Sequence, residues 1–251
     1  PAEAWQTAGG ANAWAGMVVD DMRGIVYVPT GSAVDDFYGA DRPGDNLFAN
    51  SLVALDASTG KRLWHFQLVH HDVLDRDPPS PPVLLTVNQN GRKIDVVAQT
   101  TKHGVLFVLD RVTGKPVFPI EERAVAQSDL PDEKTSATQP FPLKPEPYAR
   151  QQLTADMLTM RTPEANKAAR ETFAQSRALG PFGPLTVGKP TIVFPGFDGG
   201  AEWGGPAVDR PAGVIYINSN EMAWLGSLRE IGVAANEGSG SSLYQQQCAV
   251  C

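Results

Sequence analysis

Side chains capable of acid–base chemistry gather between residues 70 and 104. The run His70–Asp77 holds two histidines and three aspartates, and Lys102 follows in a turn that ends at Gly104. A carboxylate in a cleft beside a cation can serve as a general base. One strand hairpin spans the residues between Asp75 and Lys102, so both can return to the same end of a sheet. We therefore predict that Asp75 is a base and Lys102 its cationic partner.

Two other interpretations of the run His70–Asp77 are open. First, the composition of this run is also typical of a solvated acidic loop. Histidine and aspartate are metal ligands as well, but the chain has four histidines, no His-x-x-x-His pattern and no second cysteine pair, which disfavours zinc.

The two cysteines, Cys248 and Cys251, form a Cys-x-x-Cys motif on the last residue of the chain. A disulfide or redox pair is one interpretation, although a thioredoxin-like context is lacking. Zinc would need a second pair. Covalent haem attachment needs Cys-x-x-Cys-His, in which the histidine would be the next residue. Residues 243–247 before the motif are typical of the opening helix of a small cytochrome.

Three tryptophans, Trp14, Trp203 and Trp224, are either core residues or platforms for a planar ligand. Trp203 precedes Gly204 and Gly205, where the backbone leaves room for such a ligand. Asn218 ends an expected strand and is either a cap or a polar contact to the ligand.

The elements that must position these residues are short strands in pairs. The turn Asp56–Gly60, followed by Trp64, has a second copy at Asp110–Gly114, and we expect it to be scaffold in which Asp56 bonds the turn backbone and Trp64 packs between blades. A segment from Trp14 to Val28 also recurs from Trp203 to Ile217. Such repeats are typical of β-propeller blades. Strand pairs are expected at 17–19 with 25–28, 52–55 with 63–68, and 83–87 with 94–99 across Asn90-Gly91, then at 105–109, 192–194 and 214–217.

The remaining segments are expected to be loops, with one helical insertion. Residues 32–50 and 119–150 are predicted as loops, and residues 235–242 as a flexible linker. Within 154–179 a thin apolar stripe predicts one short and one longer helix, with Thr154 and Thr162 as N-caps. The formal charge of −7 argues against nucleic acid as a partner, and no apolar run has the length of a membrane span.

Taken together, these motifs resemble the pyrroloquinoline quinone (PQQ)-dependent dehydrogenases, closest to the membrane-bound glucose dehydrogenase branch. The resemblance covers residues 9–230. It rests on Tyr27–Ser32, Asn50–Asp56, Trp64–Gln67, His71-Asp72 with Asp75 and Asp77, Lys102–Gly104, Thr138–Pro142, Phe194–Gly196 and Glu202–Gly205.

The resemblance implies an all-β fold, a β-propeller that is eight-bladed in the family and about half present here, and PQQ near its axis. Asp75 matches the catalytic aspartate that takes the proton of the substrate hydroxyl. Lys102 matches the cation that binds the quinone oxygens, Trp14 the floor of the cofactor, and Asn218 an asparagine near PQQ and substrate. Trp203 and Gly204 are further expected cofactor contacts, and the substrate would be a sugar or an alcohol.

Departures from the family pattern concern the metal and the ends of the chain. Ser32 stands where the family has an asparagine ligand, a weak position for Ca²⁺ or Mg²⁺, and Leu74 replaces a tryptophan. The family's glutamate ligand lies well upstream. We therefore expect a C-terminal portion of a longer, periplasmic bacterial quinoprotein, with propeller residues 1–234 and residues 235–251 as linker and start of a cytochrome c domain. Membrane association would require segments outside this chain.

Electrons would pass from PQQ to haem c at Cys248 and Cys251, or to another cytochrome or a quinone. The alternatives are a non-catalytic propeller that binds or scaffolds, and a propeller subunit that assembles outer-membrane proteins. Neither needs Asp75, Lys102 and a haem motif together.

Overall fold

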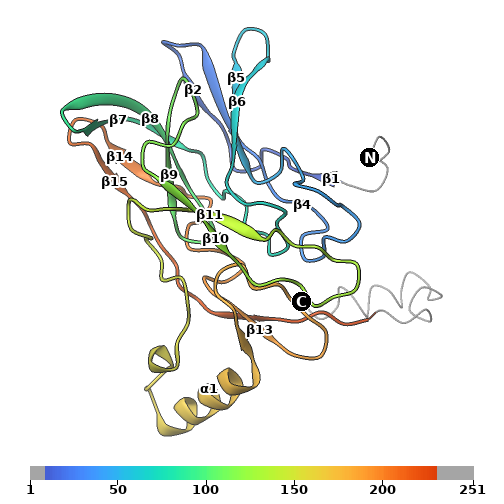
Figure 1. Ribbon diagram of the computed structural model, residues 1–251. Helices are drawn as coiled ribbons and strands as arrows, with labels where there is room; N and C mark the ends of the chain where they lie inside the picture. The colour runs from blue at the N-terminus through green and yellow to red at the C-terminus, as the bar shows by residue number, and fades with distance from the viewer. Residues whose placement is uncertain (1–8, 231–251) are drawn as a thin grey trace, which may run out of the picture.

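The computed structural model describes residues 9–230, in which short strands dominate (Figure 1). The first blade is a four-stranded antiparallel sheet in the order β2-β3-β5-β6. Its alternating buried and half-buried side chains along β3 fit a sheet with one face in a core. The strands are β2 (Val18–Asp20), β3 (Ile25–Pro29), β5 (Ser51–Asp56) and β6 (Arg62–Gln67).

The second blade is the antiparallel sheet β7-β8-β9, with strands β7 (Val83–Gln89), β8 (Arg92–Thr100) and β9 (Leu106–Asp110). The predicted hairpin at Asn90-Gly91 is confirmed, and both residues have positive φ, as a two-residue turn of this kind requires. Pro116 bridges to Leu109, so the segment after β9 occupies the place of a fourth strand.

The two blades pack face to face through a shared core. Its buried members are Ile25, Tyr27, Leu52, Ala54, Leu84, Val97 and Leu109. The repeated turn closes this interface. Asp56 Oδ1 accepts the backbone N–H groups of Ser58 and Thr59, as predicted. Trp64 Nε1 donates to Arg111 O at 3.1 Å, in the second copy of the turn. A Cβ at Gly114 would lie 2.5 Å from the Trp64 ring, so only glycine fits there.

Because Trp64 joins the two blades, Trp64→Ala is expected to lower the free energy of unfolding by about 2–4 kcal/mol. Denaturant unfolding of the complete gene product would measure this. Trp203→Ala is the matched control, since Trp203 is 75% exposed and its removal is expected to cost less than about 0.5 kcal/mol. Equal losses would show that Trp64 is not an inter-blade contact.

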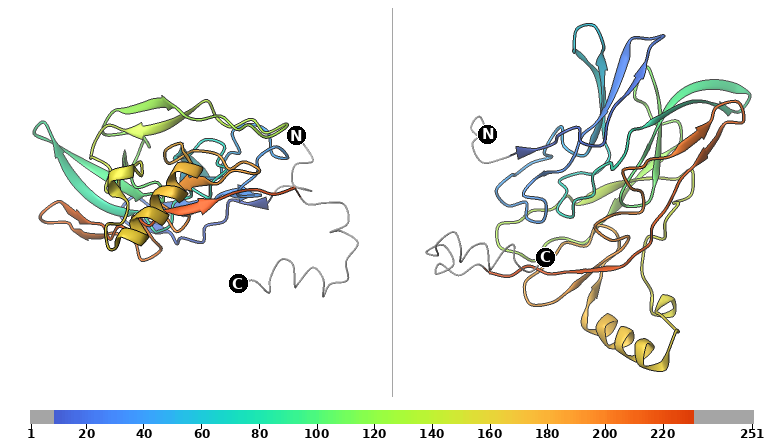
Figure 2. Two further views of the ribbon diagram at one scale, coloured as in Figure 1. Left: turned by 90° about the horizontal axis from the view of Figure 1, so that it is seen from below. Right: turned by 180° about the vertical axis from the view of Figure 1, so that it is seen from behind.

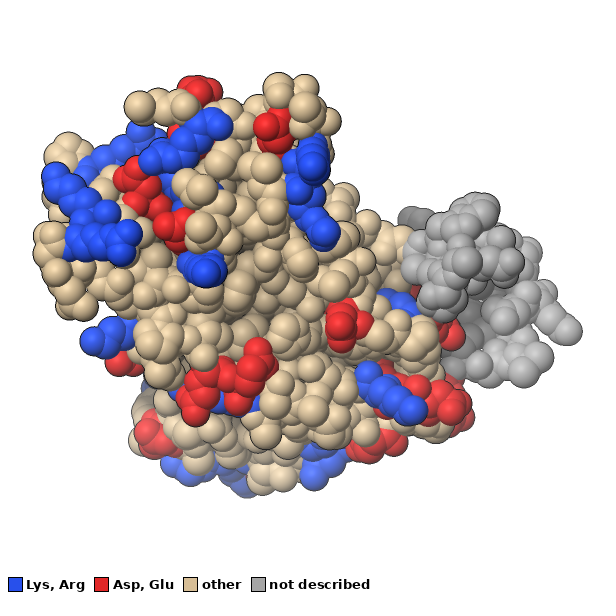
Figure 3. All heavy atoms as spheres, turned by 45° about the horizontal axis from the view of Figure 1, so that its top comes forward, with Lys and Arg blue, Asp and Glu red and all other residues tan. Residues whose placement is uncertain are grey.

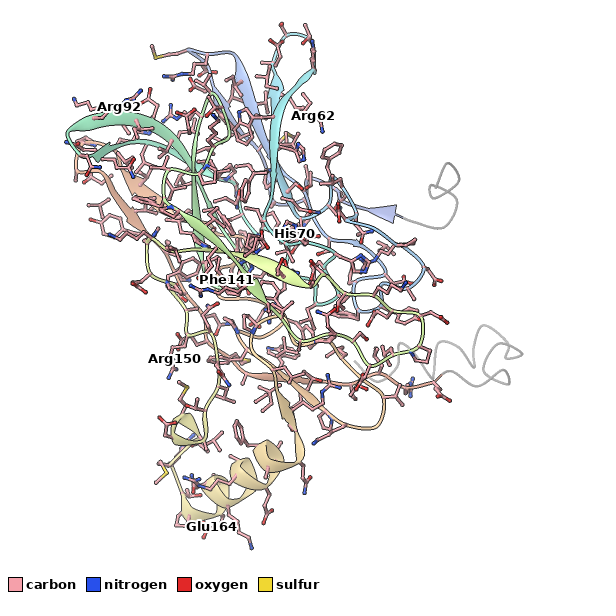
Figure 4. All side chains as sticks on the ribbon, in the orientation of Figure 1. Arg62, His70, Arg92, Phe141, Arg150 and Glu164 are labelled. Carbon is pink, nitrogen blue, oxygen red and sulfur yellow. The ribbon has the colours of Figure 1, made fainter. Side chains whose placement is uncertain are left out.

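The prediction that residues 119–150 form a surface loop is wrong in part. β10 (Ile120–Ala124) and β11 (Thr138–Pro142) pair antiparallel, and Phe141 is buried. The prolines inside β11 made this strand hard to predict from the sequence. Proline has no backbone N–H and is therefore found only at strand positions where that N–H needs no partner. Figure 4 shows Phe141 and His70 near the middle of the molecule, and Arg92 and Glu164 at its ends.

The helical insertion has the predicted form of one short and one longer helix, η2 (Ala155–Met157) and α1 (Pro163–Gln175). Thr162 caps α1 by accepting the Ala165 N–H, whereas Thr154 forms no side-chain cap. Figure 2 shows α1 standing off the strands. The remaining strands are β1 (Gly9–Gly10) with β4 (Ala33–Val34), β12 (Arg177–Ala178), β13 (Thr191–Val193) and β16 (Trp224–Gly226), and β14 (Ala207–Asp209) with β15 (Val214–Tyr216).

Within residues 9–230, no helix has the length and apolar character of a membrane span. On the face drawn in Figure 3, acidic and basic side chains gather in the same areas, with uncharged surface between them.

Candidate active site

Asp75 and Lys102 meet, as the hairpin between them predicted. Lys102 follows the end of β8, and Asp75 lies in the loop after β6. Lys102 Nζ donates to Asp75 Oδ2 at 2.7 Å. The turn that carries Lys102 is tightly packed: Gly104 has φ +84°, and a Cβ at Gly199 would lie 2.6 Å from Lys102 Cγ. The Gly199 backbone therefore packs directly against Lys102.

Asp77 is a second partner of Lys102 that the sequence did not single out. Asp77 Oδ1 forms an ion pair with Lys102 Nζ at 2.7 Å, and Asp77 Oδ2 accepts the Trp14 Nε1–H at 2.6 Å. The Lys102 ammonium also lies 5.6 Å from the Trp14 ring centroid. The only available signal was the Asp-x-Asp spacing of 75 and 77, which does not reveal which carboxylate faces inward.

The two carboxylates differ in access to solvent. The Asp75 side chain is 27% exposed and that of Asp77 only 4%. A substrate can therefore reach Asp75, whereas Asp77 is enclosed by Trp14 and Lys102. Asp75 can therefore exchange a proton with a ligand, whereas Asp77 holds its neighbours in place.

The electrostatics of the site favour proton transfer at Asp75. Burial raises the pKa of the Asp75 carboxyl to about 6; the Lys102 ammonium opposes this rise and the Asp77 charge adds to it. Burial also raises the pKa of Asp77. Burial alone would lower the pKa of Lys102, but the two carboxylates outweigh it and the pKa is raised. Lys102 thus stays charged, while the pKa of Asp75 is raised to about 6.

The other predicted cofactor residues differ in their exposure and in their contacts with the site. Trp14 is at the site and is 46% exposed, so one part of its indole is free to contact a ligand. Trp203 is 75% exposed, Gly204 is exposed, and Asn218 is exposed just beyond β15. The two repeats that contain Trp14 and Trp203 both abut one loop. A Cβ at Gly16 would contact Pro81, and one at Gly205 would contact Ser80.

The Ser32 hydroxyl is hydrogen-bonded to two buried polar residues. Ser32 Oγ donates to Asp72 Oδ2 at 2.7 Å and accepts from Asn50 Nδ2 at 3.1 Å, and the residue is buried. Over residues 9–230 no group of three or more His, Cys, Asp or Glu side chains could hold a metal. Residue type alone could not separate a metal ligand from a donor to a buried aspartate. Cys248 and Cys251 lie outside the described residues.

Comparisons with known proteins identify the family of the chain. Residues 1–248 match the model of the family described as "PQQ: Glucose/ethanol/alcohol dehydrogenase, beta-propeller domain". The chain belongs to this family. The β-propeller fold and the family resemblance inferred from the motifs are therefore confirmed.

Similar curated proteins are quinoprotein dehydrogenases. The glycerol dehydrogenase large subunit of Gluconobacter oxydans is 38% identical over 84% of this chain and 29% of that protein. The quinoprotein glucose dehydrogenase of Escherichia coli is 36% identical over 86% of this chain and 27% of that protein. The chain thus spans less than a third of the length of these relatives.

Two solved structures show the same fold. The quinohemoprotein alcohol dehydrogenase of Comamonas testosteroni superposes with a TM-score of 0.56 at 24% identity, over 86% of this chain and 26% of that one. A europium-containing methanol dehydrogenase superposes with a TM-score of 0.60 at 20% identity, over 89% of this chain and 32% of that one.

Proposed function

We propose that this chain is the Asp75–Lys102 portion of a PQQ-dependent dehydrogenase that oxidises a sugar or another alcohol. The observation that carries the proposal is the partly exposed carboxylate of Asp75, hydrogen-bonded to a buried lysine beside an accessible tryptophan ring. A site that removes a proton from a hydroxyl group beside a planar, anionic cofactor needs a carboxylate base, a cation and an aromatic surface. Membership of the family and the glycerol and glucose dehydrogenases among its relatives support the same class of substrate.

The residues at the site fit PQQ. The cofactor is flat and negatively charged, which suits an indole face beside an ammonium. A Cβ at Gly31 would lie 3.1 Å from Asp77 Oδ2 and 3.2 Å from Trp14 Cδ1, so the backbone comes close to the Trp14 edge. Trp14 and Lys102 would hold the cofactor, with Trp203, Gly204 and Asn218 as further contacts.

When bound, PQQ supplies the acceptor for the two electrons of the substrate. The protein supplies the base: Asp75 takes the hydroxyl proton, and its raised pKa leaves the carboxylate strong enough to do so near neutral pH. Lys102 provides a fixed positive charge where negative charge develops. Asp77 keeps both Lys102 and Trp14 in place.

Several parts of the function remain proposals drawn from the family resemblance. A Ca²⁺ or Mg²⁺ ion, with Ser32 as a weak ligand, is one of them. Electrons would pass to a cytochrome or a quinone, with haem c bound at Cys248 and Cys251 if residue 252 of the gene product is histidine. A periplasmic location follows from the same proposal.

Reconstitution of the complete gene product tests the function. PQQ and Ca²⁺ or Mg²⁺ would be added to the cofactor-free protein, with glucose, glycerol and ethanol as substrates and a dye as acceptor. We expect dye reduction that requires both PQQ and substrate. If the dye were reduced with none of the three substrates, the proposed enzymatic activity would be refuted. A propeller that only binds or scaffolds would then be favoured.

The Trp14 hydrogen bond gives a separate prediction for cofactor binding. Trp14→Phe removes the N–H donor to Asp77 but keeps an aromatic face, so we expect PQQ to bind about tenfold more weakly. Titration of the cofactor-free protein with PQQ would measure this. Trp64→Phe is the matched control, because it also removes one indole hydrogen bond, to Arg111 O, but in the scaffold turn. Equal weakening in both variants would show an effect of general destabilisation.

A further inference from the structure

The remaining aspartate of the run His70–Asp77, Asp72, is buried and accepts four hydrogen bonds. Its Oδ2 accepts from Ser32 Oγ at 2.7 Å, from Asn50 Nδ2 at 2.8 Å and from the Arg76 backbone N–H at 2.5 Å. Its Oδ1 accepts from the Leu74 N–H at 2.9 Å. A carboxylate is an acceptor with about four lone-pair sites, and three of the four donors converge on Oδ2 while one contacts Oδ1.

Two of the four donors lie immediately on either side of Asp75. Leu74 precedes it and Arg76 follows it, and the backbone N–H groups of both point to the one carboxylate. Asp75 itself has φ +53°, in the left-handed region that costs free energy for a residue other than glycine. The conformation of Asp75 therefore depends on contacts that hold its neighbours.

The same turn is held from the opposite side by Arg76. Its buried guanidinium donates from Nε to Pro181 O and from Nη1 to Gly196 O, both at 3.0 Å. On the Asp72 side, Arg42 donates to the backbone O of Asp72. The turn 72–76 is thus fixed between the loop 32–50 and the segments around 181 and 196, and the side chain of Asp75 is the part left facing Lys102.

We propose that Asp72 is a positioning residue, which fixes the left-handed backbone of Asp75 so that its carboxylate meets Lys102 and the substrate. The proposal rests on the function proposed above, because it assigns Asp75 a proton to take. Asp72 is buried, and its carboxylate accepts from Ser32, Asn50, Leu74 and Arg76 and not from Lys102. Its effect on the reaction acts through Asp75.

Asp72→Asn is the sharpest test, because it keeps the shape of the side chain. An amide replaces one oxygen by a donor, so at least one of the four hydrogen bonds is lost. A small displacement of a catalytic base costs a large factor in rate, and we expect kcat to fall about 10- to 100-fold. KM and the PQQ content of the folded protein should change little, and kcat is compared at equal amounts of folded protein.

A second measurement reports on the turn without any turnover. Hydrogen exchange of the Leu74 and Arg76 amides, followed in the cofactor-free protein, should be about tenfold faster in Asp72→Asn than in wild type. Ser32→Ala, which removes one donor and keeps the carboxylate, should lie between the two. The matched control is Asp56→Asn, since Asp56 also accepts two turn amides, but in the scaffold turn away from Lys102. It should leave both kcat and these amides unchanged.

The outcomes separate the inference from the function on which it rests. Unchanged exchange at Leu74 and Arg76, or unchanged kcat in Asp72→Asn, would overturn the positioning role. So would a loss of kcat that only follows losses of PQQ or of folded protein. If the wild-type protein showed no PQQ-dependent turnover, the proposed function would fail, while the exchange rates would still decide whether Asp72 fixes the turn around Asp75.

Discussion

Asp75→Asn is expected to lower kcat by about 10²- to 10⁴-fold while PQQ remains bound. Asparagine has nearly the same shape and tolerates the φ of +53° at this position, so the turn should persist. What is lost is the more exposed of the two carboxylates that pair with Lys102. Dye-coupled turnover and the absorbance of bound PQQ would be measured on the same sample. In the wild type, kcat/KM should fall as pH drops below the pKa of about 6, because Asp75 is then protonated and cannot accept the hydroxyl proton.

Asp77→Asn is the matched comparison for Asp75→Asn. Both residues pair with Lys102, but Asp77 is enclosed and also bonds Trp14. Its replacement should therefore weaken PQQ binding more than it lowers kcat at saturating PQQ. A kcat that falls equally in both variants would mean that the carboxylates act as one charged unit. If Asp75→Asn kept more than a tenth of the turnover, Asp75 would not be the base.

The parts of the structure that the sequence predicted well depend on neighbours along the chain. The Asp56 turn, the Asn90-Gly91 hairpin and the Thr162 cap are each set by a few adjacent residues. The meeting of Asp75 and Lys102 was also within reach, because a single hairpin separates them. Their chemical roles stay predictions until the variants above are measured.

The parts that the sequence did not predict depend on contacts between distant segments. β10 and β11 pair across a long connection, and Gln139 in β11 bonds the backbone of His70. The inward position of Asp77 requires the placement of Trp14, which lies far away in the chain. The hydrogen bond from the Ser32 hydroxyl to Asp72 likewise joins residues that lie far apart in the sequence. No local pattern carries that information.

Lys102→Met is expected to have the largest effect on stability, because it leaves two carboxylates of the buried site without their cation. Breaking a buried ion pair by removal of one partner typically costs about 3–5 kcal/mol, and we expect a loss of that size at pH 8. PQQ binding and turnover should be lost as well, since no other positive charge of the described residues pairs with Asp75 or Asp77. Denaturant unfolding of the cofactor-free protein at pH 8 and pH 5 would measure the loss.

The pH dependence distinguishes a missing charge from missing packing. Without Lys102, two neighbouring carboxylates in a buried site hold protons more tightly when folded than when unfolded. The folded state then binds more protons between the two sets of pKa values, so the stability of Lys102→Met should rise as pH falls from 8 to 5. The double variant Lys102→Met/Asp77→Asn, with one negative charge fewer, should recover part of the loss at pH 8 and depend less on pH. A loss that is the same at both pH values, with no recovery in the double variant, would mean that the lysine stem stabilises the turn by packing against Gly199, and that its charge contributes little.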